Sequence, residues 1–206
     1  MPEVTALFWD VGGVILSNGW DRPARAAAAR KFGLDWEEFQ DRHDLASPAF
    51  EMGQITLDTY LQRTVFYRKR DFTREEFLNF MFAQSEEFPE SRAVLSELAA
   101  SGRYLLCTIN NEAIELNEHR IKQFHLRREF KAFFSSCYVG IRKPDEGIYR
   151  LTLEVTQRLP AECLFIDDRT LNLESAQQLG IDTIHYQNAA QLRQDLKAKG
   201  VMVAGA

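Results

Sequence analysis

The sequence predicts an α/β protein: a parallel sheet with one block of helices inserted between its first two strands. Short apolar runs without polar alternation recur along the chain, and such runs are typical of strands buried on both faces. Helical patterns alternate with the later runs, which favours parallel strands joined by right-handed crossovers. The segment from Arg22 to about Leu98 contains no convincing strand. We therefore expect a sheet domain formed by 1–16 and 96–206, and a helical insertion of 17–95.

The first expected strand is the apolar run that begins at Ala6 and leads into Asp10. Gly12 and Gly13 follow it, and paired glycines allow a sharp turn and a close approach of backbone groups to a ligand. The later strands are expected in similar apolar runs. They are 103–108, then 132–134 together with 136–138 as a short third, 163–168, and 183–186.

The expected helices are marked by capping residues and by apolar side chains at helical spacing. Pro23 suits a first turn, Asp35 is an N-cap, and Thr73 with Glu76 forms a capping box. Gly102 closes the fifth expected helix, 91–100. Aromatic residues crowd this region, and we assign most of them to the core of a helix bundle. The expected helices are 23–32, one from 35, one from 56, one after 73, 91–100, 113–124, 147–157, 171–179 and 192–197.

The composition is that of an ordinary globular protein, with 45% hydrophobic and 27% charged residues among 206. The formal net charge of -5 disfavours nucleic acid as a partner but leaves a small anionic substrate possible. Three cysteines without a CxxC pair indicate a reducing compartment and no disulfide framework. The start of the chain has no signal-peptide pattern, and no apolar stretch has the length of a membrane span. We expect a cytoplasmic protein that is neither secreted nor membrane-bound.

Polar groups of complementary type end the expected strands. Because the carboxyl ends of parallel strands share one edge of a sheet, where open α/β proteins bind ligands, we expect these groups to converge. A lysine followed by proline, just before a helix, adds a positive charge to the same region. The groups are Asp10 after the first strand, Thr108, Ile109, Asn110 and Asn111 at the second, Lys143 before Pro144, and Asp167 with Asp168 at the fourth.

The carboxylates fit phosphoryl chemistry around a metal ion. Asp10 can act as a nucleophile towards phosphorus. Further carboxylates beside it would repel one another unless a hard divalent cation lay among them, and Mg²⁺ prefers such oxygen ligands. Asp10, a backbone carbonyl of the glycine turn and Asp168 can supply these ligands. The sequence therefore predicts a Mg²⁺ site at this edge of the sheet.

Two further groups would bind the phosphate itself. Thr108 offers a hydroxyl and, with Ile109 and Asn110, backbone N–H groups at a helix start, which suits an anion. Lys143 offers a point charge that would hold Asp10 and the phosphoryl group together. Each residue alone has an ordinary explanation as a helix cap, a turn residue or a solvated loop residue. Their arrival in order at the ends of successive buried strands favours the functional interpretation.

On these residues the chain resembles the haloacid dehalogenase-like hydrolases from end to end. The resemblance implies a Rossmann-like, three-layer parallel sheet core, and it identifies the helical insertion as the cap of that family. Within the family, the motifs look most like those of bacterial sugar-phosphate phosphatases of the glucose-1-phosphatase type. The four motifs are Asp10-Val11-Gly12-Gly13-Val14, Thr108, Lys143-Pro144 and Asp167-Asp168.

The resemblance also implies a role for each motif residue. Asp10 would form an aspartyl-phosphate. Mg²⁺ would be held by Asp10, the carbonyl of Gly12 and Asp168, with Asp167 beside it. The leading hypothesis is a Mg²⁺-dependent phosphatase of a small phosphorylated metabolite, such as a sugar phosphate. The phosphoryl oxygens and their charge would be met by the remaining motif residues, which are Thr108, Asn110 and Lys143.

One position departs from the family's usual pattern. Phosphatases of the family usually carry a second Asp two residues after the nucleophile, as general acid and base, and here that position is Gly12. The glucose-1-phosphatase-like members also look to have glycine there. Two other hypotheses therefore stay open: a 2-haloacid dehalogenase, which would use Asp10 on carbon without a metal, and a non-catalytic phosphate-binding protein. The Asp167-Asp168 pair, suited to a metal, speaks against the dehalogenase.

The insertion is the only segment large enough to cover the site, so we expect it to select the substrate. Its polar and aromatic candidates near the hinges are Trp20, Asp21 and His43. With Gly12 in place of an acid, a cap residue such as His43 or Glu51 could protonate the leaving group. A good leaving group would need less help. The natural substrate and the oligomeric state stay open at this stage.

Overall fold

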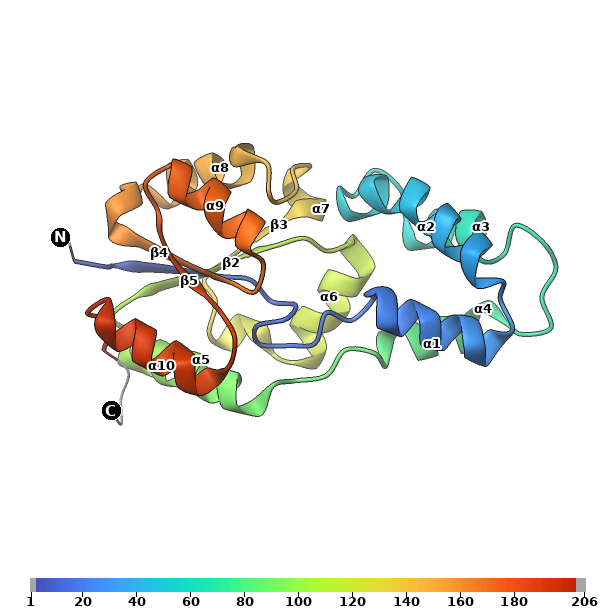
Figure 1. The fold of residues 1–206 in the computed structure, drawn as a ribbon, viewed down its shortest axis with the longest axis horizontal. Coiled ribbons are helices and arrows are strands. Elements are labelled where there is room, and N and C mark those ends of the chain that lie inside the picture. Colours follow the sequence, from blue (N-terminus) through green and yellow to red (C-terminus); the bar gives the residue numbers. More distant parts are fainter. Residues whose placement is uncertain (1–2, 203–206) are drawn as a thin grey trace.

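The computed structural model describes residues 3–202 and shows a five-stranded sheet with a group of helices beyond one end (Figure 1). All neighbouring strands are parallel, in the order β3-β2-β1-β4-β5. Helices cover both faces of the sheet and give three layers. The expected α/β fold with a three-layer parallel core is confirmed. The strands are β1 (Ala6–Trp9), β2 (Leu105–Asn110), β3 (Ala132–Ser135), β4 (Cys163–Asp167) and β5 (Asp182–His185).

The helices begin and end at residues that satisfy their free backbone groups. The carboxylates of Asp21 and Asp35 each accept a backbone N–H at the start of a helix, and Thr73 with Glu76 forms the expected capping box. Among residues 3–202, no helix is long and apolar enough to cross a bilayer. The helices are α1 (Arg22–Phe32), α2 (Trp36–Glu51), α3 (Leu57–Thr64), α4 (Arg74–Phe82), α5 (Pro89–Ser101), α6 (Ile114–Gln123), α7 (Ser136–Val139), α8 (Glu146–Thr156), α9 (Thr170–Gln178) and α10 (Ala189–Ala198), with short 3-10 turns at Leu126–Arg128 and Pro160–Glu162.

Side chains of the central strand β1 alternate between two apolar layers. Leu7 and Trp9 belong to the core on the side of α5 and α10, whereas Ala6 and Phe8 belong to the core on the side of α8 and α9. All four side chains are fully buried. A strand between two helical layers must be apolar on both faces, which explains the unbroken apolar run before Asp10.

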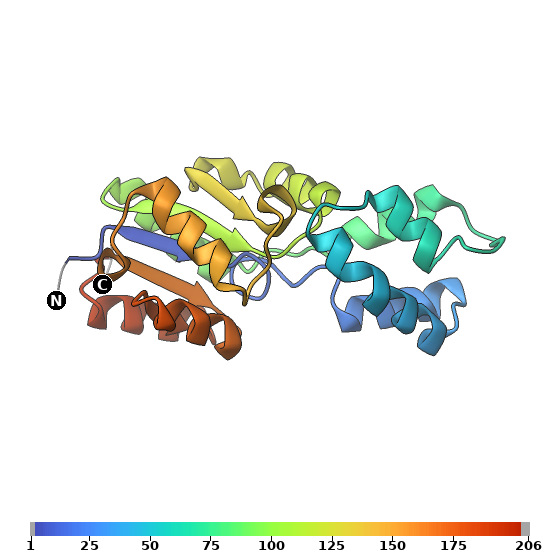
Figure 2. The same ribbon diagram turned by 90° about the horizontal axis from the view of Figure 1, so that it is seen from above.

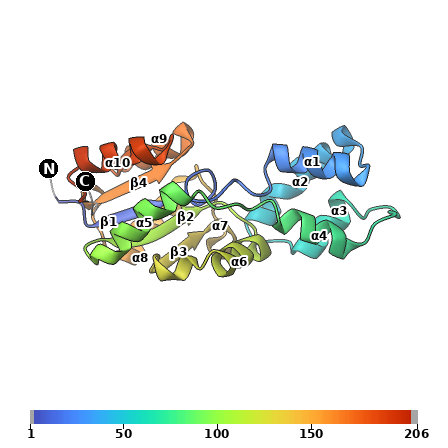
Figure 3. The ribbon, with the colours of Figure 1, turned by 90° about the horizontal axis from the view of Figure 1, so that it is seen from below.

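Helices α1 to α4 form the cap, which lies beyond the carboxyl edge of the sheet (Figures 2 and 3). The cap has its own apolar core, in which Phe39, Tyr60 and Phe77 are almost completely buried. The Trp20 ring packs edge-on against Phe39 and Phe77. The structure thus confirms the expected aromatic core of the helix bundle.

The insertion ends earlier than expected. We placed its boundary after residue 95, but α5 packs on the sheet, where Val94, Leu95 and Leu98 share one core with Trp9. The pattern of α5 predicts an apolar face, but it does not tell which domain that face covers. The cap therefore ends before α5.

Two strand expectations are also corrected. Ser136, Cys137 and Tyr138 do not extend the third strand but lie in helix α7. Strand β2 runs to Asn110 instead of ending at Thr108, because its last residues pair with β3 as far as Ser135. The carboxyl end of β2 is thus two residues further along than the sequence suggested.

The cap touches the sheet domain at Gly53, just after α2. Gly53 has φ +69°, and a Cβ added to it would lie 2.3 Å from the carbonyl oxygen of Cys137 in α7. Next to this contact, the hydroxyl of Ser136 donates to the carbonyl of Glu51 at 2.6 Å. Only glycine permits so close an approach of two backbones at a positive φ.

Replacement of Gly53 by alanine should therefore destabilise the protein more than replacement of Gly33. Both positions have positive φ (+69° and +59°), so both variants bear the cost of a left-handed alanine, about 1–2 kcal/mol. Nothing lies within 4 Å of a Cβ at Gly33, which makes Gly33→Ala the matched control. Thermal unfolding should give the lower Tm for Gly53→Ala. Equal Tm values would show that the contact between cap and core does not contribute to stability.

Candidate active site

Strand β1 delivers Asp10 to the middle of the carboxyl edge of the sheet. Trp9 pairs with Thr108 of β2 on one side and with Ile166 of β4 on the other, so Asp10 emerges between these two strands. The Asp10 side chain is 11% exposed, and its Oδ1 accepts the N–H of Val11 at 2.7 Å. The register of the sheet, rather than any loop, therefore fixes the position of this carboxylate.

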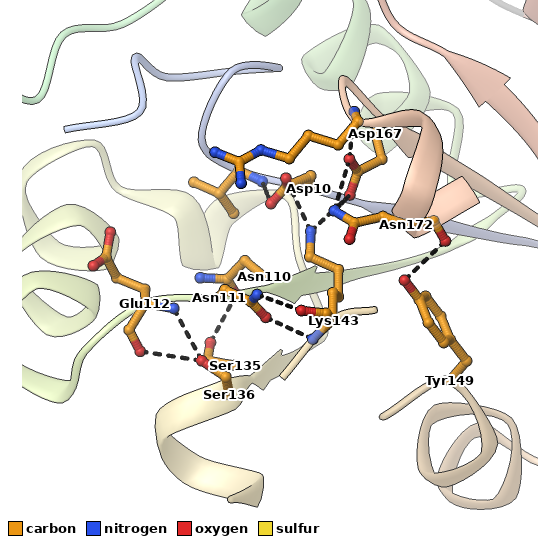
Figure 4. A network of polar contacts seen from close by, with 12 residues as sticks. Asp10, Asn110, Asn111, Glu112, Ser135, Ser136, Lys143, Tyr149, Asp167 and Asn172 are labelled. Carbon is orange, nitrogen blue, oxygen red and sulfur yellow. Dashed lines mark hydrogen bonds and ion pairs between the residues drawn. The ribbon is translucent and has the colours of Figure 1, made fainter. Parts of the chain in front are cut away.

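Lys143 connects two of the carboxylates (Figure 4). Its Nζ lies 2.9 Å from Oδ2 of Asp10 and 2.7 Å from Oδ2 of Asp167. Asp167 also accepts the side-chain amide of Asn172 and the backbone N–H of Arg169. Both oxygens of Asp167 are thus occupied, and Asp167 holds Lys143 against Asp10.

Three carboxylates, Asp10, Asp167 and Asp168, meet at this edge, with oxygens within 4.8 Å of one another. Oδ1 of Asp168 is buried and has no hydrogen-bond partner among residues 3–202. A Cβ at Gly13, where φ is +76°, would lie 2.4 Å from Oδ2 of Asp168, so glycine is needed for the turn to pass this carboxylate. A hard divalent cation fits this set of oxygen donors.

The charges at this edge perturb the titration of its groups. Burial raises the pKa of Asp10 to about 7; the Lys143 ammonium opposes this rise, and the carboxylates of Asp167 and Asp168 add to it. Burial also raises the pKa of Asp168. Burial alone would lower the pKa of Lys143, but Asp10 and Asp167 outweigh it and raise that pKa. Lys143 therefore stays charged, and its single positive charge offsets only part of the negative charge of the three carboxylates.

Two residues near the end of β2, Thr108 and Ile109, do not place their side chains where we expected. Thr108 is fully buried inside the strand, its hydroxyl has no partner among the described residues, and it does not line the cavity described below. The side chain of Ile109 belongs to the core between the sheet and α8. The next helix, α6, begins only at Ile114, so the backbone of 108–110 lies in a strand and not at a helix start. Neither Thr108 nor Ile109 is brought to the site by its side chain.

Two asparagines follow instead, Asn110 and Asn111, both of which belong to the polar stretch expected at the end of the second strand. Asn110 hydrogen-bonds to Asn117 and Ser135 and is buried. Asn111 accepts the backbone N–H of Lys143 at 2.8 Å and donates to its carbonyl at 2.9 Å. The polar pair at the end of an apolar run was the signal for a strand end at Asn110. The role of Asn111 is to fix the backbone of Lys143.

A cavity of about 460 Å³ lies over these groups, between the sheet edge and the cap. This size suits a small metabolite. The expected cleft between the two domains is therefore present. From the sheet domain it is lined by Asp10, Gly12, Asn111, Glu112, Leu116, Arg120, Arg142, Lys143, Pro144, Arg169, Leu171 and Asn172. The other lining residues belong to the cap or to the hinge, by which we mean the chain that connects β1 to α1. They are Asn18, Trp20, Asp21, Arg22, Arg25, His43, Ser47, Phe50 and Glu51.

A model of the haloacid dehalogenase-like hydrolase family matches residues 4–180. The chain belongs to this hydrolase family. It is 31% identical to flavin mononucleotide hydrolase 1 of Arabidopsis thaliana over 179 residues, which cover 84% of this chain and 70% of that protein. It is 24% identical to D-ribitol-5-phosphate phosphatase of Bacteroides thetaiotaomicron over 208 residues, which cover 92% of this chain and 95% of that protein.

Solved structures of the haloacid dehalogenase-like family share the fold. A family enzyme from Bacteroides thetaiotaomicron in complex with magnesium and inorganic phosphate superposes with a TM-score of 0.74 at 19% identity, and the match covers 92% of this chain and 98% of that one. At this identity the similarity shows the fold alone. The resemblance drawn from the four motifs is thereby confirmed at the level of family and architecture.

In this member of the family, an ion pair lies beside the glycine that replaces the usual second acid. A Cβ at Gly12 would lie 3.7 Å from Nη1 of Arg120, and that Nη1 lies 2.8 Å from Oε2 of Glu112. Arg120 also donates to the carbonyl of Ser17 at the hinge. Sequence reasoning missed Glu112 and Arg120, because charged residues on a helix or in a loop are usually solvated.

The two cap residues named as acids differ in their suitability. Burial, with the nearby Arg25 guanidinium, lowers the pKa of His43 to about 4, so His43 is neutral near pH 7 and holds no imidazolium proton to give. Burial raises the pKa of Glu51, whose Oε2 lies 3.3 Å from Arg142. Of the two, only Glu51 is shifted towards the protonated form.

The raised pKa of Asp10 predicts how metal binding depends on pH. A proton on Asp10 competes with a cation, so affinity for Mg²⁺ should fall as the pH drops below about 7, by up to about tenfold per pH unit for one displaced proton. Calorimetric titration with Mg²⁺ at pH 5.5, 6.5 and 7.5 measures this. In Asp10→Asn the dependence should become shallower. An affinity unchanged over this range in the unmodified protein would mean that Asp10 is not a ligand.

Proposed function

We propose that this protein is a Mg²⁺-dependent phosphomonoesterase that acts on a small phosphorylated metabolite, such as a sugar phosphate, through an aspartyl-phosphate on Asp10. The observation that carries the proposal is the buried Asp10, held by Lys143 among three carboxylates and lining the cavity under the cap. Similarity to D-ribitol-5-phosphate phosphatase and to an enzyme crystallised with magnesium and phosphate supports it.

The metal would be held by Asp10, the carbonyl of Gly12 and Asp168, with Asp167 beside it. The buried, unpartnered Oδ1 of Asp168 and the close passage of Gly13 support this assignment. Asp167 would act through Lys143, because both its oxygens are already hydrogen-bonded. When bound, Mg²⁺ would offset the negative charge of the carboxylates and of the phosphoryl oxygens.

In the first step, an oxygen of Asp10 would form a bond to phosphorus while the bond to the leaving alcohol oxygen breaks. The Lys143 ammonium is fixed beside Asp10 and would stabilise charge on the transferring group. In the second step, water would release phosphate and restore the carboxylate. Thr108 has no part in this proposal, since its side chain does not line the cavity.

The leaving alcohol needs a proton, and Glu51 is the cap residue best suited to supply it. Within residues 3–202, Glu51 uses one side-chain oxygen, Oε2, in its pair with Arg142. Glu112 also lines the cavity with a raised pKa, but both its oxygens are hydrogen-bonded, to Arg120 and to the N–H of Ala113. Glu51, which lines the cavity, therefore keeps one side-chain oxygen without a hydrogen-bond partner among the described residues, and Glu112 does not.

Replacement of Asp10 by asparagine tests the nucleophile. Asp10→Asn should fold with a Tm close to that of the original protein and lose more than about 10²-fold in kcat, since an amide does not attack phosphorus. Chelation should abolish the activity of the unmodified protein on 4-nitrophenyl phosphate, and added Mg²⁺ should restore it.

Other outcomes of this experiment would favour the alternatives. Halide release from a 2-haloacid with chelator present would identify a dehalogenase. No turnover of any phosphomonoester with Mg²⁺ present would favour a non-catalytic binding protein. Activity of Asp10→Asn within tenfold of the original would remove Asp10 from the mechanism.

Replacement of Glu51 by glutamine tests the proton donor. Hydrolysis of an alkyl phosphate should fall by roughly 10²-fold, whereas 4-nitrophenyl phosphate, whose leaving group departs without a proton, should be affected far less. In the unmodified protein, kcat on the alkyl phosphate should decline as the pH rises through the raised pKa of Glu51. Glu37→Gln, an exposed glutamate on the same helix, is the control. Equal losses on both substrates would contradict the assignment.

A further inference from the structure

Arg25 in helix α1 is a buried arginine that lines the cavity from the cap side. Arg25 is 7% exposed. Nη1 donates to the carbonyl of Trp20 at 2.6 Å, and Nε donates to Gln40 at 3.2 Å. No carboxylate of residues 3–202 lies within salt-bridge distance of it, and Nη2 has no hydrogen-bond acceptor within this part of the chain. One face of a buried guanidinium is thus left without a partner.

The neighbouring His43 adds a second donor to the same wall. Oη of Tyr60 accepts the indole N–H of Trp20 at 2.9 Å and lies 2.8 Å from Nδ1 of His43. Because the Trp20 N–H already donates to the Tyr60 oxygen, we infer that the single hydroxyl hydrogen of Tyr60 is donated to Nδ1 of His43. The neutral ring of His43 then carries its proton on Nε2, where it is available to a ligand in the cavity.

The other basic side chains of the cavity are either paired or solvated. Arg120 pairs with Glu112, Arg142 with Glu51, and Lys143 with Asp10 and Asp167. Arg22 and Arg169 are exposed, so water screens their charge. Arg25 alone among the basic residues that line the cavity is both buried and without a carboxylate within salt-bridge distance in residues 3–202; the carboxylates of Asp44, Asp21 and Glu51 act on it only from further away. A buried charge of this kind is costly unless something pairs with it.

We propose that Arg25 and His43 form a subsite for an anionic oxygen group on the leaving alcohol of the substrate, a carboxylate or a second phosphate. The proposal rests on the proposed function, because the phosphoryl group to be transferred would lie at Asp10 on the opposite wall of the same cavity. A planar guanidinium with a free N–H edge suits such a group. The substrate class is then a phosphomonoester whose alcohol is itself an acid.

Matched substrate pairs test this assignment in the unmodified protein with Mg²⁺. 3-Phosphoglycerate and glycerol 3-phosphate differ by a carboxylate, and fructose 1,6-bisphosphate and fructose 6-phosphate differ by a second phosphate. We expect kcat/KM at least tenfold higher for the acidic member of one pair, and the pair that shows it identifies the source of the anion. Equal values within both pairs would overturn the subsite and leave the proposed function intact. No hydrolysis of any member would overturn the proposed function, and the subsite with it.

The variant Arg25→Gln separates recognition from structural support. Its ratio of kcat/KM between acidic and neutral members should fall to near one, mostly through KM, whereas Arg30→Gln, an exposed arginine of the same helix, should keep the original ratio. A role limited to bracing Trp20 would lower both values equally and leave the ratio unchanged, which would contradict the proposal. If Arg25→Gln does not fold, Arg25→Lys, which keeps the charge without the planar edge, should lower the ratio in part.

Discussion

The arrangement of the site depends on the Lys143 ammonium between Asp10 and Asp167. Three carboxylates gather at one end of the sheet, two of them almost completely buried, and one buried ammonium faces two of the three. Unpaired charges in such surroundings are costly, because burial removes the water that would solvate them. The pKa of Asp10 rises in consequence. This imbalance of charge makes the site receptive to a cation and to a phosphoryl group.

The fold supplies this arrangement with little contribution from flexible loops. Asp10 is placed by the pairing of β1 with β2 and β4, Asp167 is the last residue of β4, and Asn111 directly after β2 fixes the backbone of Lys143. Asn172 in the first turn of α9 holds Asp167 from the other side. The groups that would bind phosphate and metal are therefore rigid, whereas the groups that would contact the rest of the substrate belong to the cap.

That the four charged groups lie together could be predicted from the sequence, because the positions of the carboxylates follow from topology. In a parallel sheet the carboxyl ends of all strands lie at the same edge, so a carboxylate that directly follows an apolar strand is placed at that edge. The position of Thr108 inside the strand could not be predicted in the same way, because the end of β2 is set by its pairing with β3, which involves residues far away in the sequence. The boundary of the cap was misplaced for a similar reason, since the apolar face of α5 does not say which core it joins. Arg25 was missed because an arginine in an Ala- and Arg-rich helix has the pattern of a solvated residue, and its burial arises only when the helices assemble.

The glycine at position 12 is required by the packing of the hinge around it, and is more than the loss of one acidic side chain. A Cβ at this position would lie 3.0 Å from Oδ1 of Asn18, and the Arg120 guanidinium, paired with Glu112 and bound to the carbonyl of Ser17, lies just beyond. The space that a second acid would take is therefore used to connect the hinge to the sheet domain. A carboxylate at residue 12 would have to displace Asn18 and would compete with Glu112 for Arg120. In the proposed reaction, proton transfer to the leaving group would therefore fall to residues elsewhere in the cavity, and the cap would take part in the chemistry as well as in recognition.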